Sequence, residues 1–147
     1  MEEKKLYVIG IGPGAREQMT VRADRILRES QVIIGYTVYV DLVKEFYPQA
    51  EFLTTPMRQE KERCEMALKA AQDGRKTAMI CSGDSGVYGM AGLVLQMAES
   101  SPDVNVEVIP GVTAALGGGA ILGAPLGHDF AVISLSDLLT PMEVIEK

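Results

Sequence analysis

The glycine-rich segment AMICSGDSGVYG, residues Ala78–Gly89, contains residue types that suit a ligand-binding turn. An apolar run that fits a buried strand, Thr77–Cys81, breaks at Ser82, Gly83 and Asp84, and a helix-like apolar pattern follows. At the carboxyl end of a parallel strand, glycines let backbone amides approach a ligand closely. The Asp84 carboxylate could accept hydrogen bonds from hydroxyl or amino groups of that ligand. Alternatively it caps the following helix, which is the commoner role for Asp at such a position.

Two further glycine-rich turns also follow expected strands, GIGPG at Gly10–Gly14 and PGVTA at Pro110–Ala114. In one parallel sheet all three turns would face the same edge, so they could line one crevice. Each turn alone is an ordinary bend, whereas the three together indicate a binding site. GIGPG lacks the Lys and Ser or Thr that a phosphate-binding loop needs after its last glycine. Its Pro13 and its glycine spacing also depart from the dinucleotide pattern GxGxxG.

Strands and helices are expected to alternate along the chain that carries these turns. The apolar patterns predict strands over residues 5–9, 31–34, 51–53, 77–81 and 104–109, and helices over 20–30, 36–46, 59–73, 88–99 and 112–122. Thr20 is the expected N-cap of the first helix, and Gly35 is expected to end the second strand. The Ala- and Gly-rich helix over 112–122 is expected to pack closely. Such alternation predicts an α/β fold, a parallel five-stranded sheet with helices on both faces.

The segment that follows residue 122 predicts further structure. Gly123–Gly127 (GAPLG) suggests a hinge, Phe130–Leu135 suggests another strand, and Thr140 with Pro141 suggests the first turn of another helix. We therefore expect an N-terminal α/β domain over residues 1–122, with residues 123–147 forming a linker and the truncated start of a second α/β domain. The alternative is a small tail that folds back on the sheet.

Length and composition restrict the function. The chain has 147 residues, 47% of them apolar, which is enough for one core. Two distant cysteines, Cys64 and Cys81, and one histidine, His128, match no zinc site, so we expect no metal and interpret the cysteines as reduced packing residues. The net charge of -6 argues against nucleic-acid binding. No signal peptide or membrane-spanning stretch is evident, and we expect a soluble, cytoplasmic protein.

Several motifs together resemble a known family. GIGPG, CSGDSGVYGMA and VIPGVTAA, at residues 10–14, 81–91 and 108–115, resemble the tetrapyrrole methyltransferases, which use S-adenosylmethionine. A narrower resemblance, to the precorrin-3B (cobalt-factor III) methyltransferases of cobalamin synthesis, is carried by Gly35-Tyr36 with Tyr39, by YGM at residues 88–90, and by GAPLGHDFAVISLSDLLTP at residues 123–141. These enzymes methylate ring carbon 17 with ring contraction. The sequence departs from the family by Ala15, where many relatives have Asp, and by its shorter length.

The resemblance implies a cofactor, a substrate and an assembly. It implies that S-adenosylmethionine lies in a cleft between two domains, in contact with Pro13, Ser82, Gly83, Asp84, Thr113 and Ala114. It further implies a homodimer and an acidic tetrapyrrole substrate, a precorrin, lying in a trough beside GIGPG. The residues expected to contact this substrate are Gly12, Gly14 and Arg16.

Methyl transfer from a sulfonium requires alignment and exclusion of water more than an acid or a base. Small residues and turns suit that requirement. Ring contraction also needs proton transfers, for which Asp84, Tyr88 and His128 are the available candidates. For His128 a half-exposed structural role is the alternative.

The carboxylates of a tetrapyrrole would be met by cations. Arg16, Arg58, Lys61 and Arg63 lie nearest in sequence to the expected crevice loops, and Arg can bind a carboxylate with two hydrogen bonds. For Lys61 and Arg63 we favour a solvated helix face instead. Tyr36 and Tyr39 could stack on a macrocycle or fill the edge of the core.

Two other functions are compatible with these features. The chain could belong to another tetrapyrrole methylase, such as a uroporphyrinogen or diphthine methyltransferase. It could instead form a non-catalytic module that binds a nucleotide or S-adenosylmethionine. If the sequence covers only one wall of a two-domain cleft, we expect the isolated chain to be inactive.

Overall fold

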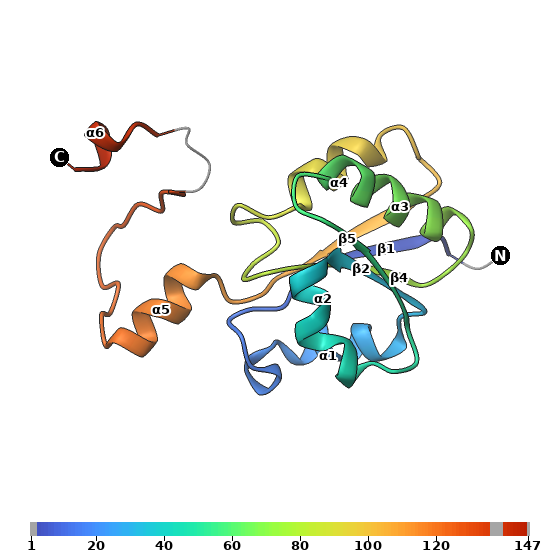
Figure 1. Cartoon of the computed structure of the whole chain (residues 1–147), viewed down its shortest axis with the longest axis horizontal. Coiled ribbons are helices and arrows are strands. Elements are labelled where there is room, and N and C mark those ends of the chain that lie inside the picture. The colour runs from blue at the N-terminus through green and yellow to red at the C-terminus, as the bar shows by residue number, and fades with distance from the viewer. Residues whose placement is uncertain (1–2, 136–139, 147) are drawn as a thin grey trace.

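A computed structural model describes residues 3–135 and 140–146 (Figure 1). Its centre is a parallel five-stranded sheet with the strand order β3-β2-β4-β1-β5. The strands are β1 (Lys5–Gly10), β2 (Val32–Tyr36), β3 (Glu51–Thr55), β4 (Thr77–Cys81) and β5 (Asn105–Ile109). The predicted α/β class and the five-stranded parallel sheet are therefore confirmed.

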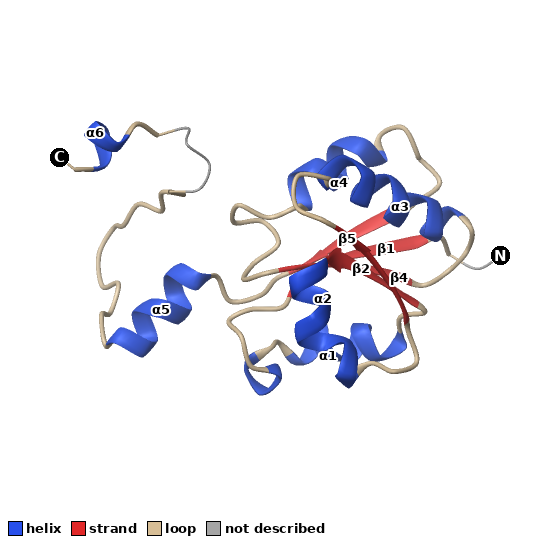
Figure 2. Ribbon diagram, viewed as in Figure 1, coloured by secondary structure: helices blue, strands red, loops and turns tan. Residues whose placement is uncertain are grey.

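Helices cover both faces of this sheet (Figure 2). Helices α3 (Glu60–Gln72) and α4 (Ala91–Ala98) pack on one face, while α1 (Val21–Glu29) and α2 (Thr37–Val43) pack on the other. Short 3-10 helices occupy Arg16–Gln18 and Lys44–Phe46. Because successive strand residues point to opposite faces, Val8 contributes to the core under α3 and α4 and Ile9 to the core under α1 and α2.

A local sequence signal explains the start of α1 but not the end of β2. Thr20 caps α1 as predicted, since its Oγ1 accepts a hydrogen bond of 3.2 Å from the Ala23 amide. Gly35, however, lies inside β2 and does not end it. A Cβ atom at Gly35 would lie 2.6 Å from Cγ1 of Ile80 on the neighbouring strand β4. It would also lie 3.2 Å from Cγ2 of Val40 in helix α2, so the glycine is required for packing between α2 and the sheet, and the prediction of a strand end was wrong.

Helix α4 begins at Ala91, three residues later than the predicted start at Tyr88. Tyr88 has a positive φ of 49°, which a right-handed helix does not allow. The Ala91 amide instead donates to the Ser85 carbonyl over 3.0 Å, and a Cβ at Gly89 would lie 2.3 Å from that oxygen. Residues 82–90 consequently form a long loop at the carboxyl end of β4.

The chain beyond β5 departs furthest from the prediction. Helix α5 (Ala114–Leu122) was expected to pack closely, but Ile121 and Leu122 are 83% and 81% exposed, and Gly117 is its buried residue. Figure 1 shows this segment leading away from the sheet. The predicted strand Phe130–Leu135 is irregular, because no described strand lies beside it to supply hydrogen-bond partners.

A short helix α6 (Met142–Ile145) follows Pro141, as expected. Whether residues 123–147 begin a second domain stays a prediction. None of the helices in the described ranges is long and apolar enough to cross a membrane.

Candidate functional site

The three glycine-rich turns meet at the carboxyl edge of the sheet. Strands β4, β1 and β5 are neighbours, so the turns that follow them are brought side by side. The Gly12 amide donates to the Gly83 carbonyl over 3.0 Å, and the Val112 amide donates to the Gly12 carbonyl over 3.4 Å. We call this cluster the rim, defined as residues 10–13, 82–84 and 111–114. The prediction that the turns share one edge is confirmed.

The rim is packed backbone against backbone. A Cβ atom at Gly12 would lie 2.3 Å from the Val112 carbonyl oxygen and 2.5 Å from Cα of Gly83. At Gly10 and Gly111 a Cβ would lie 2.6 and 2.2 Å from the Gly83 carbonyl oxygen. Real Cβ atoms do not approach other atoms this closely, so only glycine permits this arrangement.

Asp84 holds two of the rim loops together. Its Oδ1 accepts a hydrogen bond of 2.9 Å from the Gly111 amide, and its Oδ2 accepts one of 2.9 Å from the Gly86 amide. The expectation that Asp84 caps the next helix was wrong, because α4 begins at Ala91 with Met90 at its N-cap. The carboxylate instead fixes the loop after β4 to the loop after β5. Each oxygen keeps a second lone pair, so binding of the cofactor by Asp84 stays a prediction.

The outer surface of the rim is open to a ligand. Pro13, Ser82 and Ala114 are exposed, and Thr113 is half-buried. Thr113 occupies the N-cap of α5, but its side chain forms no capping hydrogen bond. Helix N-termini of this kind carry amide donors and a positive dipole end. The structure thus brings the predicted cofactor residues together, and their role stays a prediction.

The predicted proton-transfer residues are not assembled into one site. Tyr88 is 61% exposed, and its hydroxyl donates to the Val132 carbonyl over 2.9 Å. His128 is exposed beyond α5, and among the described residues no hydrogen bond or ion pair joins it to the rim. Their catalytic roles therefore stay predictions.

Arg16 lies in a cavity beside the rim instead of on the rim. This cavity of about 650 Å³ is also lined by Gly14, Leu42 and Phe46. The Arg16 guanidinium lies 5.3 Å from the centre of the Phe46 ring, and its Nε lies 3.1 Å from Oδ1 of Asp24. The hydrogen bond that Arg16 donates to Asp24 raises the pKa of Arg16. Arg16 therefore already has an anionic partner within the chain.

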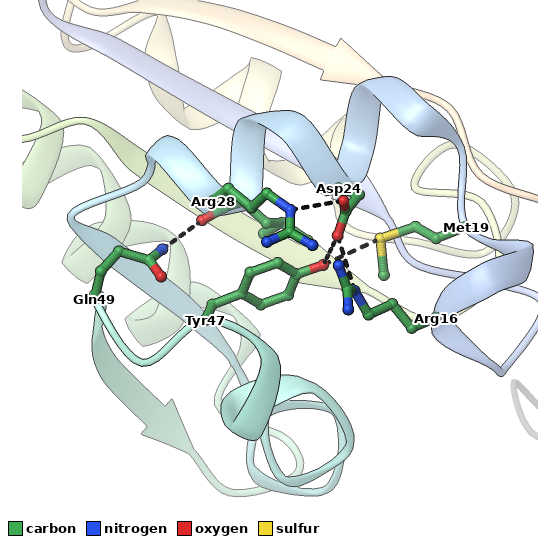
Figure 3. A network of polar contacts seen from close by, with 7 residues as sticks. Arg16, Met19, Asp24, Arg28, Tyr47 and Gln49 are labelled. Atoms are coloured by element: carbon green, nitrogen blue, oxygen red, sulfur yellow. Dashed lines mark hydrogen bonds and ion pairs between the residues drawn. The ribbon is translucent and has the colours of Figure 1, made fainter.

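Asp24 is the centre of a polar network that sequence reasoning missed (Figure 3). Besides Arg16, its carboxylate accepts hydrogen bonds of 2.9 Å from the buried Tyr47 hydroxyl and 2.9 Å from Nε of Arg28. Burial and the hydrogen bond to Asp24 raise the pKa of Tyr47, which keeps the phenol neutral. The network links α1 to the loop after α2. The spacing of Asp24 and Arg28, four residues apart, was the available sequence signal.

A second cavity, of about 380 Å³, lies at the carboxyl ends of β2 and β4. Its wall includes Tyr36, Tyr39, Ser82 and Arg63. The two tyrosine rings pack edge to face with their centres 5.2 Å apart. Their position on a cavity wall leaves both proposed roles, stacking and filling of the core edge, open.

Arg63 corrects one prediction, because only 5% of this residue is exposed. It does not belong to a solvated helix face. The buried positions of α3 include Arg63, Ala67 and Ala70, which share one helix face through their spacing of four and three residues. That spacing was a signal for burial in the sequence. Lys61, with 80% of its side chain exposed, does lie on the solvated face, as predicted.

The cysteines are confirmed as buried, unpaired packing residues. Burial raises the pKa of Cys64 and of Cys81 to about 11, so both are neutral thiols at pH 7. Across the parts of the chain that the structure describes, no group of three or more His, Cys, Asp or Glu side chains could hold a metal ion.

Comparison with known proteins identifies similar sequences. The model of the family described as Tetrapyrrole (Corrin/Porphyrin) Methylases matches residues 5–147. The chain is 50% identical over 143 residues to a Salmonella typhimurium protein named "Probable cobalt-factor III C(17)-methyltransferase", covering 97% of this chain and 59% of that protein. It is 46% identical over 144 residues to the Archaeoglobus fulgidus "Cobalamin biosynthesis protein CbiHC", covering 97% of this chain and 32% of that protein. The chain therefore spans less than two thirds of the length of these relatives.

Solved structures give the same result for the fold. The crystal structure of the methyltransferase CobJ superimposes with a TM-score of 0.83 at 37% sequence identity, covering 96% of this chain and 60% of that one. The structure of the cobalt precorrin-4 methyltransferase CbiF superimposes with a TM-score of 0.74 at 28% identity, covering 86% of this chain and 54% of that one.

Proposed function

Because this chain belongs to the tetrapyrrole (corrin/porphyrin) methylase family, we propose that it forms the cofactor-binding part of an S-adenosylmethionine-dependent methyltransferase of cobalamin synthesis. The substrate is precorrin-3B or cobalt-factor III, methylated at ring carbon 17 with ring contraction. The names of relatives at 46–50% identity support this substrate class.

The observation that carries the proposal is the convergence of three turns on one rim. The rim offers a ligand the exposed Ser82 hydroxyl and the Thr113 hydroxyl, which is not used in capping α5. Gly83 has a left-handed backbone with a φ of 58°, which turns the loop toward Thr113. A Cβ atom added at Gly83 would lie 3.4 Å from Cα of Thr113. A small polar ligand fits this arrangement, because backbone groups and hydroxyls surround it without bulky side chains.

We assign the rim the task of holding the cofactor, through Pro13, Ser82, Gly83, Asp84, Thr113 and Ala114. When bound, S-adenosylmethionine supplies an electrophilic methyl group on sulfur. The residues of the rim then orient the ligand, and orientation alone can supply a large part of the rate of such a displacement. The Asp84 hydrogen bonds to Gly86 and Gly111 keep the loops in a fixed position, which makes the site preorganised.

Other parts of the proposal depend on the family resemblance. We propose that an acidic tetrapyrrole lies beside Gly12, Gly14 and Arg16, and that proton transfers involve Asp84, Tyr88 or His128. A homodimer and a cytoplasmic location also stay predictions, as does the start of a second domain at residue 123.

The test measures cofactor binding and methyl transfer separately. Isothermal titration of the protein with S-adenosylhomocysteine is expected to give saturable binding, and ATP and NAD are expected to bind at least tenfold more weakly. Preference for ATP or NAD would refute the proposal. Transfer of a labelled methyl group to cobalt-factor III, compared with uroporphyrinogen III, then tests the substrate.

Matched variants locate the binding site. Thr113→Val removes the hydroxyl at the N-cap of α5 while preserving side-chain volume, and it should weaken S-adenosylhomocysteine by about 3- to 10-fold, the value of one hydrogen bond. Thr54→Val is the control, because Thr54 is exposed on β3 at the far edge of the sheet. Equal affinities of the two variants would remove Thr113 from the site.

A further inference from the structure

Arg63 is a buried cation that has no acidic partner among the described residues. It is 5% exposed, and none of the ion pairs among the described residues includes it. Burying a charge is costly unless the charge is paired. The ion pairs among the described residues join side chains that are at least partly exposed. The buried guanidinium of Arg63 instead lies 6.0 Å from the centre of the Tyr36 ring, and its burial requires a specific explanation.

The guanidinium has more donors than the described residues satisfy. Nε donates to Thr55 Oγ1 over 2.8 Å and Nη2 donates to the Pro56 carbonyl over 3.2 Å, while the one described acceptor near Nη1 is Met90 Sδ at 4.0 Å. Five N–H groups thus meet three acceptors, and one of the three is a weakly accepting thioether. The two oxygen acceptors hold the side chain in a fixed orientation, and the Nη1 side keeps donors for a further acceptor.

These donors line the cavity of about 380 Å³ at the ends of β2 and β4. The wall of the cavity is mainly aromatic and apolar, with Tyr36, Tyr39 and Met57 among its residues. Glu60 also lines it, but its Oε1 accepts from the Arg58 amide over 3.2 Å and it forms no ion pair with Arg63. A mainly apolar cavity whose wall carries a buried cation, and a carboxylate that already accepts from a backbone amide, suits a ligand with a carboxylate on an apolar or aromatic frame.

We propose that this cavity is a carboxylate-binding subsite in which Arg63 binds an acid side chain of the tetrapyrrole substrate. The inference rests on the proposed function and adds to it the position of one substrate group. Ser82 belongs both to the cavity wall and to the rim, so a ligand here lies next to the proposed cofactor site. Pro13, Gly83, Thr113 and Ala114 are not part of the cavity wall, which favours the substrate over the cofactor as the source of the carboxylate.

Binding of uroporphyrin, a tetrapyrrole with eight carboxylates, tests the subsite by quenching of its fluorescence. Arg63→Gln removes the charge and is expected to weaken uroporphyrin by about 10- to 100-fold, the range for a hydrogen-bonded charge. It should leave the affinity for S-adenosylhomocysteine within twofold of the wild-type value. Lys61→Gln is the matched control on the exposed face of the same helix and should change neither affinity.

A second pair of variants avoids the risk that Arg63→Gln does not fold. Met57 lines the cavity and is 64% exposed, so a charge there is tolerated by the fold. Met57→Glu should weaken uroporphyrin by about threefold and Met57→Lys should strengthen it by about as much, as expected for a partly exposed charge pair. If Arg63 only links Thr55 and Pro56, Met57→Glu and Met57→Lys should bind uroporphyrin with equal affinity.

The outcomes separate this inference from the proposed function. Uroporphyrin affinity that depends neither on Arg63 nor on the charge at residue 57 refutes the subsite, while S-adenosylhomocysteine binding still supports the function. Loss of S-adenosylhomocysteine binding alone in Arg63→Gln would assign the cavity to the carboxylate of the cofactor and refute the proposal. A wild-type protein that binds neither ligand would refute both.

Discussion

The packing of the rim predicts opposite effects for two glycines of the same loop. In Gly12→Ala, the new Cβ would lie 2.3 Å from the Val112 carbonyl oxygen and 2.5 Å from Cα of Gly83. Both neighbours are backbone atoms, so no side-chain rotation can relieve the contact. In Gly14→Ala, two residues later, the new Cβ would have nothing within 4 Å.

The magnitude follows from the distance that must open. An ordinary contact between carbon and oxygen is about 3.5 Å, so the loops around Gly12 must separate by roughly 1 Å. Overpacking of this kind costs about 1–3 kcal/mol. The hydrogen bond from the Gly12 amide to the Gly83 carbonyl is also at risk, and it is worth about 1 kcal/mol. We expect Gly12→Ala to lose about 2–4 kcal/mol, whereas Gly14→Ala should be neutral or gain up to about 1 kcal/mol through the unfolded state.

Urea unfolding and titration with S-adenosylhomocysteine measure these effects. Gly12→Ala should lower the free energy of unfolding and weaken the ligand by more than tenfold, because Gly83 and Val112 move with the loop. Gly14→Ala should preserve both quantities. If the two variants have equal stability and equal affinity, the tight backbone packing of the rim is not what shapes the site, and the reasoning fails.

Three further predictions concern Asp84, the two cysteines and Gly117. Asp84→Asn should cost about 1–3 kcal/mol in unfolding free energy, because an NH₂ group replaces one of the two oxygens that accept from the Gly86 and Gly111 amides. Unchanged stability would contradict the role of Asp84 in joining the two loops. Cys64 and Cys81 should react with a disulfide reagent at pH 8 only after denaturation. Because burial raises both thiol pKa values from 9.0 to about 11, the free energy of unfolding should fall between pH 9 and pH 11 by up to about 2 kcal/mol per thiol. Replacing both cysteines with Ala should flatten this pH dependence. Gly117→Ala should weaken S-adenosylhomocysteine, because its Cβ would lie 2.9 Å from the proline ring of the first rim loop, whereas Gly118→Ala, with open space around it, should not.

The sequence determined the class of the fold and which three turns form the rim. Apolar runs of strand length that alternate with helix-forming segments require a parallel sheet, and a parallel sheet places every strand-following turn at one edge. Thr20 capped its helix as predicted because capping depends on neighbouring residues alone. These are local or topological consequences, and they need no coordinates.

Other features depended on contacts between distant residues. Gly35 was expected to end a strand, and only its contact with Ile80 of another strand shows that it is a packing residue. The strand expected at Phe130–Leu135 is irregular because a strand exists only beside a partner.

The roles of the polar side chains were decided by the tertiary structure. Asp84 was expected to cap a helix and instead joins two loops, since the Gly111 amide that it binds comes from a different strand end. Arg63 was predicted to lie in solvent, but it is buried and donates a hydrogen bond to Thr55 at the end of β3. Local patterns fix backbone conformation through nearest neighbours, whereas the environment of a charge is set by residues that only folding brings near it.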